Sequence, residues 1–361
     1  MKRNKLFILF SVLMIAVFVL AACAPAEETA APETEEPPAA ETEEAEEPEG
    51  LTFGVSLDAL FLGRQAEMEG VRAAADELGV TLLESVADND AQQQNAQIES
   101  FINQGVDAIL IVPVDNTAIL TAIDAAEEAG IPVVTFDRKV DGADYVSYHS
   151  GLDSYSDGMA CGEYVKDQND GGDNVVLHLL GALNDDNAIQ RRDGFEDALE
   201  GEDNLEIVQQ PTDWNADTAL AAVENALVNY PNLWAIQVPS DFMQDSIKTA
   251  LEAAGKLKRA DEPGHIIVCT IDGAEPGYRA TVEGWTDAVV ALPLGQLGRG
   301  ALENAVKVVN GEELEVTDQR FPGDLYTWEN ALENADKIWG ATGVNVEPME
   351  ETGLTFGVSL D

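Results

Sequence analysis

The chain has 361 residues, 45% of them hydrophobic, which is enough for two domains with separate cores. Its 68 acidic residues outnumber its 19 basic residues and give a formal net charge of −49. Nucleic acids and anionic membrane surfaces would repel such a chain, so neither is an expected partner.

The amino end of the chain resembles an export signal. Basic residues precede an apolar run over residues 6–20, which is too short and too near the amino end for a transmembrane helix. The sequence Leu20-Ala21-Ala22-Cys23 is similar to a bacterial lipobox, in which the cysteine is lipidated. We therefore predict a signal peptide over residues 1–22 and a lipid on Cys23 that anchors the protein to the cell membrane. An ordinary signal sequence that leaves Cys23 as a free thiol is the alternative.

Residues 23–50 form an acidic segment. It contains eleven glutamates and neither a basic nor an aromatic residue. Such a segment buries too little apolar surface to offset the entropy lost on ordering, so we predict an extended, disordered tether. The tether would separate the folded part of the chain from the lipid.

From residue 51 onward, strand-like and helix-like segments alternate at short intervals. Glycines close the expected helices, as at Gly79 and Gly105, and nearly uninterrupted apolar runs form the expected strands. This alternation indicates βαβ units in a parallel, doubly wound sheet. The expected strands are 51–57, 80–86, 108–112, 131–136 and 145–149, and the expected helices are 63–78, 91–104 and 117–129.

The fourth of these strands ends in the charged pair Asp137 and Arg138. In open α/β sheets, ligands bind beyond the carboxyl ends of the strands, so the strand places a carboxylate and a guanidinium at the expected site. The two groups suit neighbouring hydroxyls on a small polyol. A salt bridge at the end of the strand is the alternative interpretation.

A second α/β half of similar size begins near residue 153. Two such halves in one chain leave a crevice between them, and this crevice is the expected ligand site. The expected strands of this half are 174–180, 205–210, 235–238 and 266–271, and the expected helices are 155–168, 187–199, 217–228 and 246–254.

Cys161 and Cys269 are the two cysteines beyond the lipobox. Export permits a disulfide, but their positions in the sequence give no distance between them, and we prefer two separate buried thiols. The sequence contains no closely spaced cysteines and histidines of the kind that bind zinc. We expect neither a metal nor a cofactor.

Six motifs occur in an order that resembles one protein family. They are the run from Asn103 to Asp115, the pair Asp137-Arg138, Gly162-Glu163-Tyr164, Arg191-x-x-Gly194-Phe195, Gln210-Pro211-x-Asp213-Trp214 and Ile271-Asp272-Gly273. Together they are similar to periplasmic binding proteins of the ribose and galactose type, the sugar-capturing components of ABC importers. The resemblance covers residues 51–328 and implies two doubly wound α/β lobes joined by a three-segment hinge.

The resemblance also implies domain boundaries. We expect hinge crossings near residues 151–153, 291–293 and 320–322, so that an expected helix over 296–309 returns to the first lobe. The expected first lobe is 51–152 with 292–320, and the expected second lobe is 153–291 with 321–345.

Residues 346–361 would then form a tail. Its last part, residues 353–361, repeats residues 50–58 identically. A truncated tandem duplication and an artefact of sequence assembly both account for the repeat. Two copies cannot occupy one strand position, so we expect the terminal copy to be unpaired.

The family resemblance assigns ligand-binding residues to both lobes. In such a site, two aromatic rings cover the C–H faces of a sugar while charged groups bond its hydroxyls. The implied residues are Phe61, Asp137, Arg138, Arg191, Trp214 and Asp272. The alternatives are packing in a lobe core for the two aromatic residues, a solvated helix face for Arg191 and a capped turn for Asp272.

Three departures from the ribose binders imply a different ligand. Ala59 stands where those proteins carry Asn, Ser240-Asp241 where they carry Asn-Asp, and Ala291 where they carry Gln. Hydrogen-bonding groups are thereby shortened or lost. We therefore expect another pentose or hexose, a polyol such as inositol, or a furanose-like quorum signal. We expect Ser240 to contact the ligand, and the groups that could compensate for the losses are Asn89, Asp115 and Gln244.

The expected function is capture of a small sugar or polyol by a monomeric, extracytoplasmic lipoprotein that delivers it to an ABC import permease. The sequence lacks a phosphate-binding glycine motif and a nucleophile elbow, so we expect no enzyme, and a carbohydrate-active enzyme is a weaker alternative. Regulators built on the same fold carry a helix-turn-helix where this chain has a signal and an acidic tether. A module that presents sugar or a quorum signal to a chemoreceptor or kinase is the main alternative.

Overall fold

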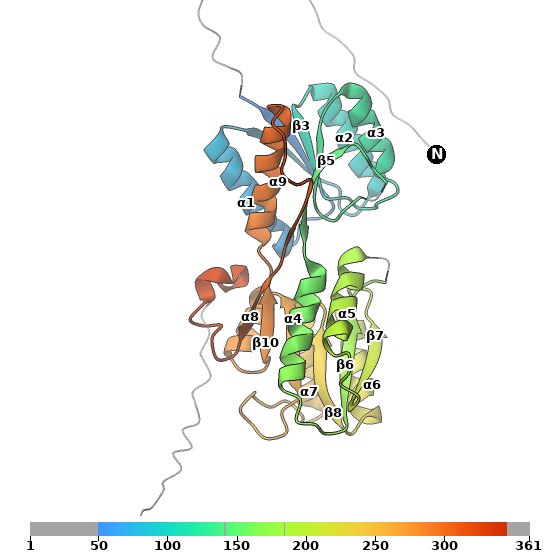
Figure 1. The fold of residues 1–361 in the computed structure, drawn as a ribbon, viewed down its shortest axis with the longest axis vertical. Helices are drawn as coiled ribbons and strands as arrows, with labels where there is room; N and C mark the ends of the chain where they lie inside the picture. The colour runs from blue at the N-terminus through green and yellow to red at the C-terminus, as the bar shows by residue number, and fades with distance from the viewer. Residues whose placement is uncertain (1–49, 141, 184, 345–361) are drawn as a thin grey trace, which may run out of the picture. The chain divides into compact units, whose positions relative to one another are not determined.

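A computed structural model describes residues 50–344, except 141 and 184. The predicted signal peptide, the lipidated Cys23, nearly all of the tether and the repeat-bearing tail lie outside these residues. The described part forms two α/β lobes, each built on a six-stranded sheet (Figure 1), which confirms the predicted fold class. No helix within it is both long enough and apolar enough to cross a membrane.

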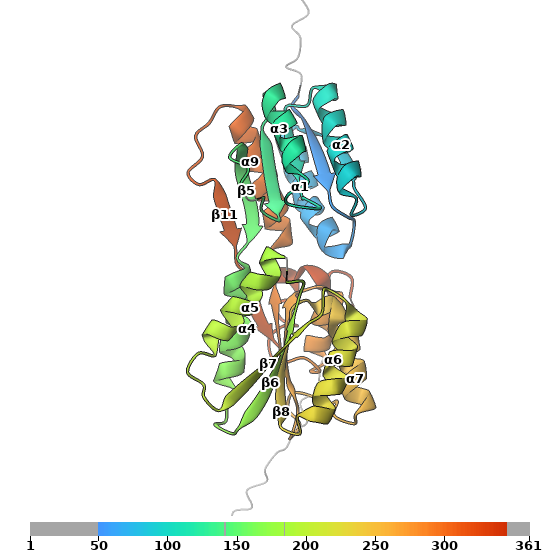
Figure 2. The same cartoon turned by 90° about the vertical axis from the view of Figure 1, so that its right-hand side faces the viewer.

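The first lobe alternates strands and helices, and a late helix and a late strand return to it. Its elements are β1 (Thr52–Leu57), α1 (Leu62–Leu78), β2 (Thr81–Val86), α2 (Ala91–Gln104), β3 (Ala108–Ile111), α3 (Leu120–Ala129), β4 (Val133–Asp137), β5 (Val146–Leu152), α9 (Leu294–Val309) and β11 (Asp318–Phe321). All neighbouring strands are parallel, in the order β2-β1-β3-β4-β5-β11 (Figure 2). Strand β3 is entirely buried, as expected for a strand that helices cover on both faces.

The second lobe repeats this plan. Its elements are α4 (Ser154–Asp167), β6 (Asn174–Leu180), α5 (Asp186–Ala198), β7 (Leu205–Pro211), α6 (Ala216–Asn229), β8 (Leu233–Val238), η1 (Asp241–Met243), α7 (Gln244–Ala253), β9 (Ile267–Asp272), α8 (Glu275–Val282), β10 (Ala288–Ala291), β12 (Asp324–Thr327), η2 (Ala335–Lys337) and η3 (Trp339–Ala341). The strand order is β7-β6-β8-β9-β10-β12, and β12 is antiparallel to β10.

The chain passes between the two sheets at three places. It leaves the first sheet after β5, returns to it between β10 and α9, and leaves it again between β11 and β12. A main-chain hydrogen bond joins the first and third passages, since Asp153 N–H donates to the carbonyl of Phe321 at 3.0 Å. Passages of only a few residues can absorb the backbone rotations of a hinge.

Each sheet has a point where the strand order reverses. These points lie between β1 and β3 in the first lobe and between β6 and β8 in the second. Ligands of doubly wound sheets bind beyond the carboxyl ends of the strands at this position. The loops that follow these strands are therefore the places in which to look for a site.

Cys161 of α4 and Cys269 of β9 form a disulfide, with 5.7 Å between their Cα atoms. Our preference for two separate thiols was therefore wrong. The packing of α4 against β9 brings together residues that are 108 positions apart, and this proximity follows from the tertiary structure. The bond is fully buried and ties the helix that follows the first passage to the strand that ends in Asp272.

Two element boundaries differ from the predictions by three residues, each for a physical reason. Strand β5 runs to Leu152 instead of residue 149, because the late strand β11 pairs with its last four residues. Helix α3 begins at Leu120 instead of residue 117. The side chain of Asp115 accepts hydrogen bonds from the main-chain N–H groups of Thr117 and Ala118, which holds residues 115–118 in a turn.

Candidate functional site

A cavity of about 350 Å³ lies between the carboxyl ends of the two sheets. This volume lies within the range of small-molecule sites. The first lobe lines it with residues after β3 and β4, including Asp115 and Arg138. The second lobe lines it with residues after β6 and β7, including Asn187 and Trp214. Two of the eight predicted ligand-binding residues therefore line this cavity, Arg138 from the first lobe and Trp214 from the second.

In the first lobe, a buried ion cluster holds the predicted pair in place. Arg64, on the first turn of α1, donates from Nε to Asp58 Oδ1 at 2.9 Å and from Nη2 to Asp137 Oδ2 at 2.8 Å. It also pairs with Glu67 one turn later. Arg138 Nη1 lies 3.1 Å from Asp58 Oδ2, so the network fixes both members of the pair.

Our sequence analysis missed the members of this cluster other than Asp137 and Arg138. Charged residues such as Arg64 and Glu67 on an amphipathic helix resemble a solvated face. The late helix α9 packs against α1 (Figure 1), and Arg64 is fully buried. A signal was nevertheless present, because Asp58 directly follows the buried strand β1 at the switch point.

Burial and charge set the protonation of the cluster. Burial raises the pKa of Glu67 to about 8; the cation of Arg64 opposes this shift, and the charges of Asp137 and Asp58 add to it. Burial also acts to raise the pKa of Asp137, but the attraction of Arg64 and Arg138 outweighs it and the pKa lies below the usual range. Asp137 is therefore ionised at neutral pH and acts only as a hydrogen-bond acceptor.

In the second lobe, three predicted residues lie together. Arg191 of α5 donates from Nη1 to the carbonyl of Pro239 at 2.8 Å and lies 3.4 Å from Asp272 Oδ1. The hydroxyl of Ser240 donates to the other oxygen of Asp272. Burial raises the pKa of Asp272, while Arg191 opposes this shift. Arg191 also lowers the pKa of Asp137 in the first lobe, so the charged groups of both lobes act on one another.

Buried polar atoms near Arg191 lack a partner within the described residues. They are Nε of Arg191 itself, Oδ2 of Asp157 and Oδ1 of Asp241. Burial raises the pKa of Asp157 to about 7, and burial together with Asp272 raises that of Asp241 well above its usual value. An unsatisfied buried donor or acceptor costs roughly 1–3 kcal/mol, so these atoms are candidates to bind hydroxyl groups.

Backbone strain is concentrated at the predicted site residues. Among the described residues, six that are not glycine have positive φ. Four of the six are predicted site residues, namely Asn89 (φ 61°), Asp137 (59°), Trp214 (55°) and Asp272 (115°). Such conformations cost on the order of 1–3 kcal/mol each and cluster at functional sites. The strain is an observation independent of the motifs, and it favours the same residues.

The two predicted aromatic residues differ in their surroundings. Trp214 packs against Gly181, where a Cβ atom would come within 2.3 Å of the indole ring, and its Nε1 donates to Asp185 Oδ2 at 3.2 Å. Its ring lines the cavity. Phe61 is half exposed, and the guanidinium of Arg64 lies 5.1 Å from the centre of its ring. Trp214 is thus held by packing and a hydrogen bond, whereas half of the Phe61 side chain is open to solvent.

The groups expected to compensate for lost hydrogen bonds are dispersed. Asn89 is exposed in the loop after β2 and does not line the cavity. Gln244 is buried within the second lobe, where its Nε2 donates to Thr286 Oγ1 at 2.6 Å. Asp115 borders the cavity, although its Oδ1 accepts the main-chain bonds of its own turn.

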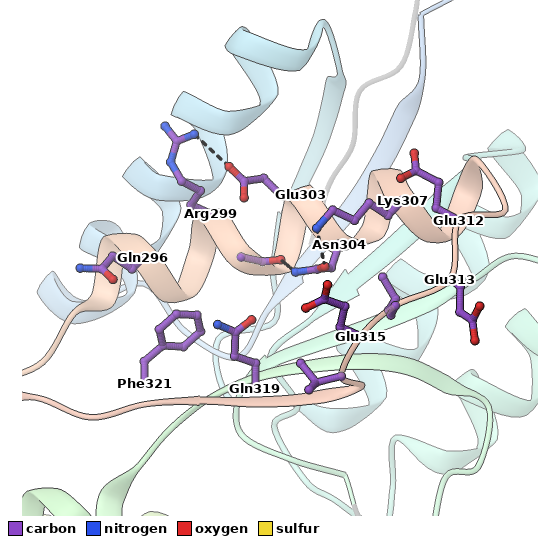
Figure 3. Close-up of a pocket in the computed structure, with 13 residues that line it drawn as sticks. Gln296, Arg299, Glu303, Asn304, Lys307, Glu312, Glu313, Glu315, Gln319 and Phe321 are labelled. Carbon is purple, nitrogen blue, oxygen red and sulfur yellow. Dashed lines mark hydrogen bonds and ion pairs between the residues drawn. The ribbon is translucent and has the colours of Figure 1, made fainter.

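A larger cavity, of about 470 Å³, lies within the first lobe between α9 and residues 312–321 (Figure 3). Glu303 and Asn304 face it from the helix, and Gln319 and Phe321 face it from β11. One lobe alone forms it, and no predicted site residue lines it. The cavity between the lobes is therefore the better candidate despite its smaller volume. The described residues contain no group of three or more His, Cys, Asp or Glu that could hold a metal.

Two doubly wound lobes with a polar cavity between them, lined by charged and aromatic side chains, define a two-lobed solute-binding protein. The model of the periplasmic binding protein domain family matches residues 64–313, and the chain belongs to this family.

Relatives of known ligand agree with this assignment. The ribose import binding protein of Salmonella typhimurium is 30% identical over 71% of this chain and 83% of its own length. A solute binding protein of an ABC transporter from Bacillus halodurans, solved with bound myo-inositol, is 29% identical with a TM-score of 0.70, covering 80% of this chain and 98% of that one. The binding protein of the arabinose ABC transporter from Shewanella, bound to L-arabinofuranose, is 27% identical with a TM-score of 0.71, covering 79% and 95%. All three relatives are binding proteins.

Proposed function

We propose that the chain is an extracytoplasmic solute-binding lipoprotein that captures a small uncharged sugar or polyol between its lobes and delivers it to an ABC import permease. It acts as a monomer without metal or cofactor and catalyses no reaction. The ligand contacts are Asp137 and Arg138 from the first lobe and Arg191, Trp214, Ser240 and Asp272 from the second, with Phe61 and Asn89 at the margin of the site.

The observation that carries this proposal is the cavity lined by both lobes. Ionised Asp137 accepts hydroxyl protons, the guanidinium groups of Arg138 and Arg191 donate to hydroxyl oxygens, and the indole of Trp214 offers a flat apolar face. A sugar or polyol needs this combination of acceptors, donors and a flat face. The positive and negative groups are both present, so a neutral ligand fits better than an ion.

The chemical class of the ligand follows from the relatives and from this site together. Ribose, myo-inositol and L-arabinofuranose are named for three relatives, and all are small, neutral and rich in hydroxyl groups. Ala59 and Ala291 offer no hydrogen-bonding side chain where the ribose binders have one. We therefore place ribose below furanoses and cyclic polyols as the natural ligand.

The buried disulfide supports the extracytoplasmic part of the proposal, because disulfides persist in oxidising compartments and are rare in the cytosol. The lipid anchor rests on the lipobox at Cys23. Expression of the full chain with Cys23→Ser tests it. We expect the variant in the soluble fraction and the unaltered chain in the membrane fraction, and equal distribution would exclude the anchor.

A thermal-shift panel of pentoses, hexoses and polyols tests the ligand class. A ligand at a hundred times its Kd adds about 2.7 kcal/mol of stability, so binding would raise the melting temperature clearly. Asp137→Ala and Arg191→Ala should abolish the shift. Arg72→Ala should preserve it, because Arg72 is an exposed residue of α1 that pairs with Glu84. Binding that survives both site variants would exclude this site.

A further inference from the structure

A hydrogen bond between side chains joins the two lobes directly at the candidate site. Nδ2 of Asn187, on the first turn of α5 in the second lobe, donates to Oδ1 of Asp137 in the first lobe at 3.2 Å. The family motifs did not single out Asn187. Asn187 lines the cavity between the lobes, so the bond lies where a ligand would bind.

The orientation of the Asn187 amide is fixed on both sides. Ionised Asp137 is an acceptor only, so the nitrogen of the amide must face it. The amide oxygen accepts from the hydroxyl of Ser154, the buried first residue of α4, at 3.1 Å. The main-chain N–H of Asn187 donates to Asp185 Oδ1, which caps α5, at 2.9 Å. The amide thus connects Asp137 to the first passage between the lobes.

The two oxygens of Asp137 are held by donors of different strength. Oδ2 accepts a charge-assisted bond from the buried Arg64 at 2.8 Å, whereas Oδ1 accepts from the neutral amide of Asn187 at 3.2 Å. Both bonds have an ionised acceptor, but only the bond from Arg64 joins two charged groups and is therefore the stronger of the two. A ligand hydroxyl in the cavity would therefore displace Asn187 and leave Arg64 in place.

We propose that Asn187 is an interlobe latch, which holds Asp137 Oδ1 in the unliganded protein and gives it up to a hydroxyl group of the ligand. The latch keeps the lobes near one another before a ligand arrives. It also competes with the ligand, so it lowers the affinity. The competition with the ligand rests on the proposed function, but the contact between the lobes does not.

Two substitutions separate the latch from other roles. Asn187→Ala removes the donor, and Asn187→Asp, of nearly the same shape, places a second carboxylate against Asp137. Gln190→Ala is the matched control, since Gln190 lies on the same helix and bonds to Asp186 within its own lobe. Unfolding curves for each variant establish that it is folded.

The distance between the lobes tests the latch without any ligand. Spin labels on Glu128→Cys of the first lobe and Val228→Cys of the second, both exposed, are introduced into the full chain with Cys23→Ser. We expect Asn187→Ala to shift the distance distribution relative to the labelled parent, and Asn187→Asp to shift it further through repulsion between carboxylates. Gln190→Ala should leave it unchanged. Distributions that coincide for all variants would overturn the latch.

Titration with D-ribose, L-arabinose and myo-inositol in turn tests the competition. For whichever of these binds, Asn187→Ala should tighten binding by up to about tenfold. Weaker binding by this variant would show that Asn187 contacts the ligand and would overturn its role as a competitor. If none of the three binds any variant, the ligand assignment fails, and the distances measured without ligand still decide the latch.

Discussion

The two lobes prepare their halves of the site in different ways. In the first lobe, Arg64 and Arg138 pair with three carboxylates, and each member of the cluster has a partner within the described residues. In the second lobe, Arg191 is a cation near Asp157, Asp241 and Asp272, and polar atoms of the first two and of the arginine itself have no partner in the described part of the chain. The charged groups that the first lobe brings to the site are therefore paired before a ligand binds, whereas those of the second lobe are paired only in part.

This difference suggests a division of labour. A completed ion cluster holds Asp137 in a strained backbone conformation and makes the first lobe a rigid docking surface. The second lobe has hydrogen-bonding capacity to spare, so a ligand that reaches it gains most from closure. What holds the second half in place is covalent, namely the disulfide between α4 and the strand that ends in Asp272.

Breaking the covalent support should have the largest effect on stability. The double variant Cys161→Ala with Cys269→Ala opens a loop of about a hundred residues, which by chain entropy corresponds to roughly 4–5 kcal/mol of unfolding free energy. Urea unfolding measures the loss. A change below about 1 kcal/mol would show that packing alone holds α4 to the sheet.

Removing the shared cation of the first lobe comes next. Arg64→Met leaves buried carboxylates without their counter-charge and should cost about 3–5 kcal/mol. Arg72→Met, on the same helix, removes an exposed ion pair with Glu84 and should cost under about 1 kcal/mol. Equal losses in the two unfolding curves would mean that the cluster is not the support described here.

The second lobe should respond to pH through Asp157. Its pKa of about 7 in the folded protein exceeds the value near 4 of an unfolded chain, so the folded state binds a proton that the unfolded state has released. The contribution of Asp157 to stability is therefore full below about pH 4 and is lost as the pH rises through about 7, by up to about 4 kcal/mol. Asp157→Asn should flatten this decline in unfolding curves between pH 5 and 8.

The control for this prediction is Asp167→Asn, an exposed carboxylate on the same helix. It should retain the decline. Glu67, with a pKa of about 8, adds a decline of the same sign in the first lobe, so Asp157→Asn should leave a remainder. A slope that is identical in the parent and in Asp157→Asn would contradict the assignment.

The smallest expected effect concerns the aromatic wall. Trp214→Ala should weaken ligand binding about tenfold, since stacking contributes roughly 0.5–1.5 kcal/mol beyond burial. Trp214→Phe should recover most of the affinity because the flat ring remains. Affinity that does not change in Trp214→Ala would place the ligand away from the second lobe's aromatic residue.

Periodicity predicted most of the fold, because buried parallel strands such as β3 and glycine-closed helices such as α2 leave strong local patterns. Motif order then selected Asp137, Arg138 and Trp214, and the structure sets these residues at or beside one cavity. The carboxyl end of β5 could not be predicted from local patterns, because the strand that pairs with it, β11, comes late in the chain.

The missed residues share a cause. Arg64, Cys161 and Asn187 all act through partners far away in sequence, at separations of 73, 108 and 50 positions. Local patterns give no distance between such partners. Arg64 and Asn187 also lie on helices, where a buried polar residue cannot be told from a solvated one until the packing of the helix is known.

A crystal structure with the sugar or polyol that gives the largest thermal shift tests the account most directly. The account predicts the ligand between the lobes, with hydroxyl groups within hydrogen-bond distance of Asp137 and Arg191 and with Trp214 against one face. A ligand in the cavity between α9 and β11, or on the outer surface of either lobe, would contradict it.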